Sequence, residues 1–169
     1  KKIKKIRKFF KDYKIDGYII PKNDEFFGEY IPENKDNLKF MTNFSGSYGF
    51  ALILKKKNYL FVDGRYTLQA KIQSGKNFKI ITFPKKLPSD VLKGKSVSVG
   101  FDPKLHTENS LSRLFDNNFI KLKPVNKNLI DLIWKRQKDS KTKPFYLIDD
   151  QDAGLQVQKK LNKLLKVIK

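Results

Sequence analysis

Blocks of alternating hydrophobic and polar residues predict a chain of short helices and strands. At the start, apolar side chains recur every three or four residues between lysines, which predicts an amphipathic helix that carries Ile3, Ile6, Phe9, Phe10 and Tyr13. Short apolar runs further along the chain are typical of buried strands. These predicted strands cover residues 18–20, 50–54, 59–62, 78–83, 97–101 and 120–123.

Helical patterns separate most of these strands. The predicted helices cover residues 37–41, 65–74, 107–115 and 128–134. Thr107 is expected to be an N-cap, and Asn128, followed by Asp131, is expected to open the last helix. Residues 55–58 join two strands as a hairpin. Strands that alternate with helices, with one hairpin among them, predict an α/β domain with a mixed β-sheet and flanking helices.

A polar segment divides the chain into two regions. Residues 135–143 (KRQKDSKTK) contain no large apolar side chain and are predicted to be a linker after the α/β domain of residues 1–134. Residues 144–169 hold one predicted strand, 145–148, and one amphipathic helix from about Leu155. The apolar face of that helix comprises Val157, Leu161, Leu164, Leu165 and Ile168. Because one strand and one helix cannot close a core, we interpret 144–169 as the start of a second, truncated α/β domain.

The composition indicates a folded chain with an excess of lysine. The 169 residues include 37 Lys and Arg against 17 Asp and Glu, a formal net charge of +20. Hydrophobic residues make up 39% and aromatic residues 13%, which argues against intrinsic disorder. The absence of cysteine excludes disulfides, thiolate metal sites and a cysteine nucleophile, and it fits a cytoplasmic protein. No apolar run is long enough to span a bilayer, so no membrane association is expected.

The positive charge has two interpretations. Nucleic-acid readers favour arginine for bidentate contacts, whereas the basic residues here are mostly lysine. The arginines are Arg7, Arg65, Arg113 and Arg136. Lysine, asparagine, isoleucine, phenylalanine and tyrosine share AT-rich codons, so genome composition also explains the charge. We therefore favour a solvated lysine surface, and a basic module that binds nucleic acid or another anionic surface is the alternative function.

Few residues in this chain are suited to catalysis. The single histidine, His106, lies between a predicted strand and a predicted helix, and we expect an exposed loop histidine rather than a metal ligand, because metal sites gather several ligands. Residues 45–49 (SGSYG) resemble a nucleophile elbow or a phosphate loop, but both need a following helix, and here a strand follows. We interpret this segment as a tight turn in which Gly46 and Gly49 permit unusual backbone angles. The sequence offers no catalytic residue and no metal site.

The tetrapeptide Asp63-Gly64-Arg65-Tyr66 is the most informative local motif. Asp63 ends a strand and can cap the helix that begins near Arg65, while Gly64 permits a sharp corner. Tyr66 can pack over the sheet. These structural roles leave Arg65 unexplained in a chain that otherwise uses lysine. Its planar guanidinium suits two-point binding of a carboxylate, which is either internal or on a substrate or neighbouring subunit.

Six segments carry a family pattern over most of residues 15–136. They are residues 15–21 (IDGYIIP), 24–32 (DEFFGEYIP), 44–49 (FSGSYG), 61–69 (FVDGRYTLQ), 99–103 (VGFDP) and 128–134 (NLIDLIW). Each motif alone is weak, but together and in this order they resemble the N-terminal domain of the Xaa-Pro aminopeptidases (aminopeptidase P), relatives of prolidase and creatinase. Two positions depart from the family pattern. Phe26 stands where the family often has histidine, and Asn43, which tolerates left-handed backbone angles, stands where it often has glycine.

The resemblance implies a domain of the creatinase/prolidase N-terminal type in a metal-dependent exopeptidase that releases the N-terminal residue preceding proline. In that family, a "pita-bread" domain holds two metal ions, commonly manganese, through two Asp, one His and two Glu. This catalytic domain lies C-terminal to everything in the present chain. We therefore expect no cofactor and no catalysis in this chain alone, and two manganese ions in the absent catalytic domain.

The resemblance also implies a role for this region in the full-length protein. That protein is expected to be a cytoplasmic homo-oligomer that acts on proline-containing peptides. The present domain is expected to shape access to the active site and to take part in subunit contacts. Within it, Arg65 is the candidate for contact with substrate or with a neighbouring subunit.

Overall fold

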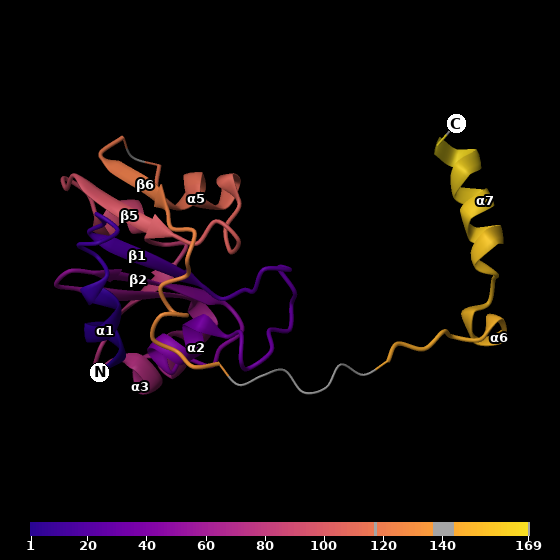
Figure 1. Cartoon of the computed structure of the whole chain (residues 1–169), viewed down its shortest axis with the longest axis horizontal. Coiled ribbons are helices and arrows are strands. Elements are labelled where there is room, and N and C mark those ends of the chain that lie inside the picture. The colour runs from indigo at the N-terminus through magenta and orange to yellow at the C-terminus, as the bar shows by residue number, and fades with distance from the viewer. Residues whose placement is uncertain (117, 137–143, 169) are drawn as a thin grey trace. The chain divides into compact units, whose positions relative to one another are not determined.

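A computed structural model describes residues 1–116, 118–136 and 144–168, and a six-stranded sheet is the centre of its first part (Figure 1). The strands are β1 (Gly17–Pro21), β2 (Gly49–Leu54), β3 (Asn58–Asp63), β4 (Lys79–Phe83), β5 (Val97–Phe101) and β6 (Ile120–Pro124). They lie in the order β4-β3-β2-β1-β5-β6. β2 runs antiparallel to β1 and β3, and the other neighbouring pairs are parallel. The predicted mixed sheet is confirmed.

The helices of this part are short. They are α1 (Lys2–Lys8), α2 (Asn37–Thr42), α3 (Thr67–Ser74), α4 (Pro88–Val91) and α5 (Glu108–Leu114), with a 3₁₀ turn, η1 (Gly64–Tyr66), before α3. The predicted cap at Thr107 is confirmed, because its hydroxyl accepts a hydrogen bond from the backbone N–H of Ser110 at 3.1 Å. α1 ends at Lys8 and the chain continues in turns to Lys14, so the first helix is shorter than its apolar pattern suggests. α4, which starts at Pro88, was not predicted.

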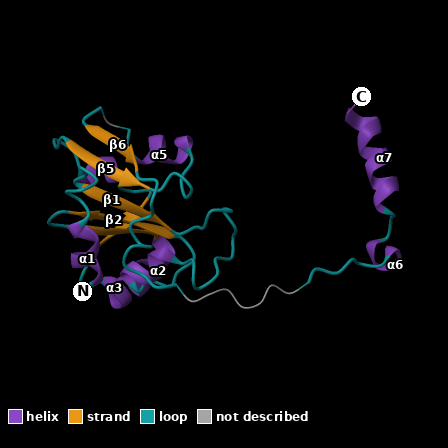
Figure 2. Cartoon of the chain, in the orientation of Figure 1, coloured by secondary structure: helices purple, strands orange, loops and turns teal. Residues whose placement is uncertain are grey.

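Both faces of the sheet are covered, and the strands are accordingly apolar along their length. Successive side chains point to opposite faces: Tyr18 and Ile20 belong to one core cluster, and Ile19 between them belongs to the other. α1, α2 and α3 contribute to the first cluster, and α5 contributes Leu111 to the second. Figure 2 shows the strands as a layer between these helices.

The segment that follows β6 differs from its prediction. Residues 129–133 form consecutive turns rather than a helix, with Asp131 N–H donating to the Asn128 carbonyl and Ile133 N–H to the Ile130 carbonyl. The side-chain oxygen of Asn128 accepts the N–H of Ile130 at 2.9 Å, and its amide donates to buried Asp102 at 2.8 Å. Asn128 thus caps a turn, and its bond to a second loop holds the backbone in a non-helical path.

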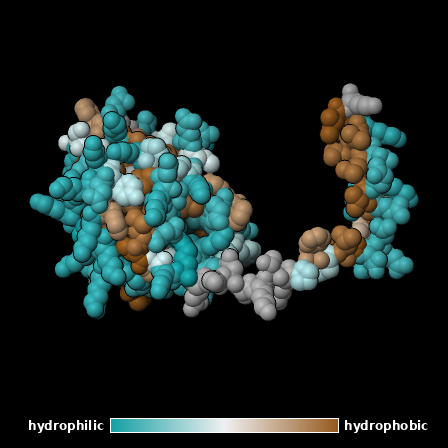
Figure 3. All heavy atoms as spheres, in the orientation of Figure 1, coloured by the Kyte–Doolittle hydropathy of each residue, from teal (hydrophilic) through white to brown (hydrophobic). Residues whose placement is uncertain are grey.

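The chain divides into two compact units, Lys1–Lys138 and Asp139–Lys169. Most of the predicted linker, residues 137–143, lies outside the described residues. The predicted strand at 145–148 is wrong: these residues are exposed and pair with no strand in the described chain, and a strand needs a partner for its backbone hydrogen bonds. Two helices follow, α6 (Asp150–Ala153) and α7 (Val157–Ile168). α7 confirms the predicted amphipathic helix, and its apolar side chains gather along one side (Figure 3).

Candidate functional site at the carboxyl edge of the sheet

Several loops meet at one edge of the sheet because β1, β3, β4, β5 and β6 all run towards it. The segment before β2 starts from the same edge. The polar residues there include Asp24 after β1, Asp63 at the end of β3 and Asp102 after β5. In open α/β sheets, ligands bind outside the carboxyl ends of the strands. This edge is therefore the candidate functional site.

A loop rich in aromatic residues borders the site. Residues 22–36, between β1 and α2, form what we call the aromatic loop; it exposes 76% of Phe26, 51% of Phe27 and 88% of Tyr30. Buried Asp24 organises it, since one carboxylate oxygen accepts the N–H groups of Phe26 at 3.0 Å and Gly28 at 3.3 Å. Phe27 has φ 54°, a left-handed backbone that is strained for an aromatic residue. Such strain is concentrated at functional sites.

Two of the hollows beside this loop are lined by Phe27. The larger, which we call the edge hollow, has a volume of about 570 Å³ and is lined by Phe27, Tyr48, Arg65, Phe83 and Pro84, among others. The smaller, of about 250 Å³, shares Phe27 and Tyr48 and extends to His106. Tyr48 and Phe83 are in contact, with ring centroids 5.9 Å apart. The edge hollow therefore combines aromatic walls with two cationic side chains, Lys22 and Arg65, and two carboxylates, Glu29 and Asp63.

Arg65 binds a carboxylate within its own motif. Asp63 Oδ1 accepts hydrogen bonds from the backbone N–H of Arg65 at 2.9 Å and from its Nε at 3.0 Å, and Oδ2 accepts one from Nη2 at 3.3 Å. These hydrogen bonds lower the pKa of Asp63 and raise that of Arg65. Asp63 is a cap as expected, but of the 3₁₀ turn η1, because α3 itself starts at Thr67; of the alternatives for Arg65, the structure contains the internal carboxylate contact. The Arg65 side chain is still 74% exposed where it lines the edge hollow.

The other motif residues make packing contacts or lie in tight turns. Tyr66 packs edge-to-face on Phe44 at 5.9 Å, and its hydroxyl shares a hydrogen bond of 2.8 Å with Ser47, as expected for a packing residue. The interpretation of Gly46 and Gly49 is corrected, because neither has a positive φ. Close packing explains both positions: a Cβ on Gly49, for example, would lie 2.8 Å from the carbonyl oxygen of Phe61. Gly64 also has no positive φ, and the nearest atom to its Cβ position is 3.9 Å away.

His106 is not the exposed loop histidine that the sequence predicts. Its ring is largely buried, contacts Phe101 edge-to-face with centroids 6.0 Å apart, and lines the smaller hollow. Its Nε2 atom is buried without a hydrogen-bond partner in the described residues. Burial lowers the pKa of His106 to about 4, so the imidazole is neutral at pH 7. The sequence placed His106 in a loop correctly, but it gave no sign that the aromatic loop packs nearby.

The residues present do not fit a metal centre. In the part of the chain that the structure describes, no three His, Cys, Asp or Glu side chains are placed to hold a metal ion together. The same part contains no helix long and apolar enough to cross a bilayer. No catalytic step through a metal can therefore be derived from these residues. What they form is a polar and aromatic rim.

Sequence reasoning missed several residues of this rim. Asp24 belongs to a recognised motif, but its role in folding the aromatic loop depends on its burial. Tyr48, Phe83 and Pro84 meet only because β2 and β4 flank β3. Nothing in the sequence indicates that Tyr48, in the turn before β2, lies near Phe83 and Pro84 at the end of β4.

Comparisons with known proteins agree with this geometry. The sequence pattern of the "Creatinase/Prolidase N-terminal domain" matches residues 2–131. A probable Xaa-Pro aminopeptidase P from Coprinopsis cinerea is 29% identical over 97% of this chain and 28% of its own length. One from Aspergillus niger is 32% identical over 98% of this chain and 28% of its own length. The chain thus spans a little over a quarter of the length of these relatives.

Solved structures share the fold. The X-prolyl aminopeptidase of Caenorhabditis elegans, described as a cytosolic enzyme with a di-nuclear active site, superposes with a TM-score of 0.84 at 24% identity, over 99% of this chain and 30% of its own. The N-terminal domain of the cytoplasmic peptidase PepQ from Mycobacterium tuberculosis gives 0.60 at 19% identity, over 78% and 96%. With the sequence match over residues 2–131, these likenesses establish that the chain belongs to the creatinase/prolidase N-terminal domain family.

Proposed function

We propose that this chain is the non-catalytic N-terminal domain of a metal-dependent Xaa-Pro aminopeptidase, and that its carboxyl edge shapes access to the active site. The relatives named Xaa-Pro aminopeptidase P extend well beyond the matched region. The single observation that carries the proposal is the edge hollow, in which the aromatic rings of Phe27, Tyr48 and Phe83 and the exposed guanidinium of Arg65 line one concave surface. Two manganese ions and the reacting groups would then belong to the rest of the enzyme.

The chemistry of the edge hollow suits a peptide that contains proline. Aromatic-lined grooves receive proline-rich segments, because the pyrrolidine ring packs on aromatic faces. Phe27, Tyr48 and Phe83 supply such faces. The exposed guanidinium of Arg65 offers a charge-assisted donor to a peptide carbonyl or carboxylate. Exposed Phe26 and Tyr30 suit contacts with a neighbouring subunit of a cytoplasmic homo-oligomer.

The test is a kinetic comparison in the full-length enzyme that carries this domain. Arg65→Ala is expected to lower kcat/KM for Xaa-Pro peptides by about tenfold, or to change the oligomeric state measured by ultracentrifugation. Arg113→Ala, on the exposed side of α5, is the matched control and should leave both unchanged. If the Arg65 variant folds and matches the wild type in kinetics and assembly, the assignment of Arg65 fails.

A second candidate function is binding to an anionic surface, and one observation favours it. A hollow of about 370 Å³ lies at the other end of the strands, where β1 and β5 begin. Its lining includes Lys55, Lys56, Lys57 and Lys95. Lys55 pairs with Asp16, whereas Lys56 and Lys57 have no ion-pair partner among the described residues. Nucleic-acid affinity through such lysines should fall steeply with salt. If duplex and single-stranded DNA do not bind at about 0.15 M salt, this candidate is removed.

A further inference from the structure

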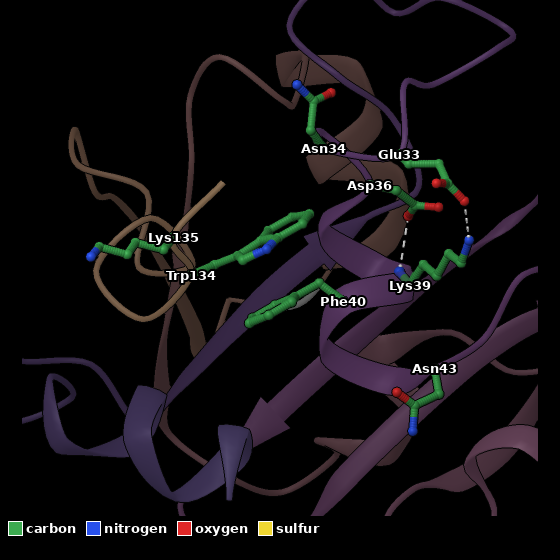
Figure 4. A pocket seen from close by; sticks show the side chains of 8 residues that line it. All are labelled: Glu33, Asn34, Asp36, Lys39, Phe40, Asn43, Trp134 and Lys135. Atoms are coloured by element: carbon green, nitrogen blue, oxygen red, sulfur yellow. Dashed lines mark hydrogen bonds and ion pairs between the residues drawn. The ribbon is translucent and has the colours of Figure 1, made fainter. Parts of the chain in front are cut away.

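Side chains from three separate parts of the chain form a stack around Trp134, which lies near the end of the first unit in sequence. The rings of Phe40, in α2, and Trp134 lie parallel, with centroids 4.3 Å apart and an interplanar angle of 7° (Figure 4). A cation covers the outer face of each ring. Lys2 Nζ lies 4.3 Å from the Phe40 centroid, and Arg136 Cζ lies 4.5 Å from the Trp134 centroid. Trp134 is thus enclosed between Phe40 and Arg136.

The guanidinium of Arg136 also joins two distant segments through hydrogen bonds. Its Nη1 donates to the backbone carbonyl of Asn34 at 2.6 Å, and its Nη2 donates to the side-chain oxygen of Asn37 at 2.7 Å. Its Nε donates to Asp131 Oδ1 at 2.8 Å. These contacts use the planar fork of arginine, which a lysine ammonium cannot reproduce while also stacking on an indole.

Both ends of the aromatic loop are fastened close together. Asp36 accepts the N–H of Lys39 at 2.9 Å as the cap of α2, and pairs with Lys22 at 2.5 Å, where both side chains are nearly buried. Lys22 begins the loop directly after β1. Arg136 holds the other end through Asn34 and Asn37. The strained and exposed part of the loop, around Phe27, lies between these two attachments.

We propose that Arg136 is a positioning residue that fixes the aromatic loop to the point where the chain leaves its first unit. Residue 136 contacts backbone 102 positions earlier, so a displacement of Arg136 acts directly on the loop through its side chain. The loop borders the edge hollow, and its position therefore depends on a residue outside that hollow. This inference concerns the loop itself and does not require that the hollow receives a peptide.

Hydrogen exchange of the 169-residue chain tests the proposal. Backbone N–H groups of the loop and of the start of α2 are hydrogen-bonded at Phe26, Phe27, Gly28, Lys35 and Lys39, so their exchange rates report how often the loop opens. Arg136→Gln is expected to raise the exchange of residues 24–37 about tenfold, which is typical when one of several charged contacts is lost. The amides of β1, β2 and β3 should not change.

A charge-preserving variant separates the planar fork from the positive charge. Arg136→Lys can still pair with Asp131, but it cannot also bind Asn34 and Asn37, so its exchange should resemble that of Arg136→Gln. Arg113→Gln removes an exposed arginine from α5 and is the matched control, expected to exchange as the wild type does. The fluorescence of Trp134, the only tryptophan, should shift to longer wavelength in Arg136→Gln. Without the guanidinium over one face, the indole ring is more exposed to water.

Three results would overturn the proposal. Unchanged exchange over residues 24–37 in Arg136→Gln would show that other contacts hold the loop. Faster exchange throughout β1, β2 and β3 would show that Arg136 acts on the stability of the whole unit rather than on the loop. Wild-type exchange in Arg136→Lys would show that charge alone suffices. If Arg136→Gln does not fold, Asp131→Asn provides the weaker variant, and it should raise exchange in the same region.

Discussion

The ring of Phe44 occupies the space that a side chain at Gly46 would need: a Cβ on Gly46 would lie 2.2 Å from Phe44 Cζ. Phe44 is fully buried in the core between the sheet and the first three helices. The backbone at Gly46 therefore passes directly over a core ring. This contact fixes the turn that presents Tyr48 to the edge hollow.

Gly46→Ala is expected to destabilise the domain. The added methyl group must displace either the buried Phe44 ring or the backbone, and overpacking of this kind costs about 1–3 kcal/mol. Urea denaturation followed by Trp134 fluorescence measures the change. Gly64→Ala is the control, since its nearest neighbour would be 3.9 Å away, and it should change stability by less than about 0.5 kcal/mol. Equal losses in the two variants would contradict the packing argument.

His106 is expected to make stability depend on pH. Its pKa is about 4 in the folded protein against 6.5 for the free side chain, so the unfolded chain binds the extra proton between these values. Stability should therefore fall as the pH falls from about 6.5 to 4, by up to about 3 kcal/mol. Denaturation midpoints across this range measure the effect. His106→Phe should flatten the slope, and parallel slopes for variant and wild type would refute the prediction.

Asp16 and Asp63 do not produce the same dependence of stability on pH. Hydrogen bonds lower the pKa of Asp16 and of Asp63 below the ordinary 3.8, so the stability they contribute is lost only below about pH 4. The window assigned to His106 therefore lies above theirs.

Arg7→Lys is expected to loosen the attachment of α1. Arg7 Nε donates to the Leu54 carbonyl at 2.8 Å, and Nη2 donates to Asn58 at 2.7 Å, so one guanidinium holds both strands of the β2–β3 hairpin. Lysine can satisfy one acceptor at most, and the loss should be about 1–2 kcal/mol by urea denaturation. Lys8→Arg, one position later on α1, is the control and should be neutral. A neutral Arg7→Lys would show that the fork is dispensable.

The isolated chain is expected to be indifferent to manganese. A site with a Kd of about 10 μM would add about 2.7 kcal/mol at about 1 mM metal, several degrees in Tm. We expect a shift below about 1 °C, no effect of EDTA, and no cleavage of Xaa-Pro peptides. Metal-dependent cleavage by the pure chain would contradict the assignment of catalysis to residues outside it.

The strands that are buried on both faces of the sheet could be predicted from the sequence. Runs such as Phe50–Leu54 are apolar at every position because both sheet faces are covered, and they were located almost to the residue. The helix expected at 128–134 failed because Asn128 bonds to Asp102, a partner 26 positions away that no local pattern reveals. The strand expected at 145–148 failed because strand propensity does not supply a neighbour.

The candidate site was predictable only in part. Asp63, Arg65 and Tyr66 stand in one motif and make the local contacts expected of them. The surroundings of Arg65 come from three other loops, brought together by strand order. The burial of His106 and the contacts of Arg136 likewise depend on segments far away in sequence.

The strand order also has a consequence expected for assembly of the domain during synthesis. β1 to β4 all lie within the first 83 residues and are adjacent in the sheet, so they can pair while the ribosome is still translating the rest. β1 must then wait for β5, which it meets through Gly17–Val99 and Tyr18–Gly100. Until that moment its outer edge is unpaired, and unpaired edges recruit other chains. We therefore expect the nascent protein to be most open to aggregation between the emergence of β4 and that of β5.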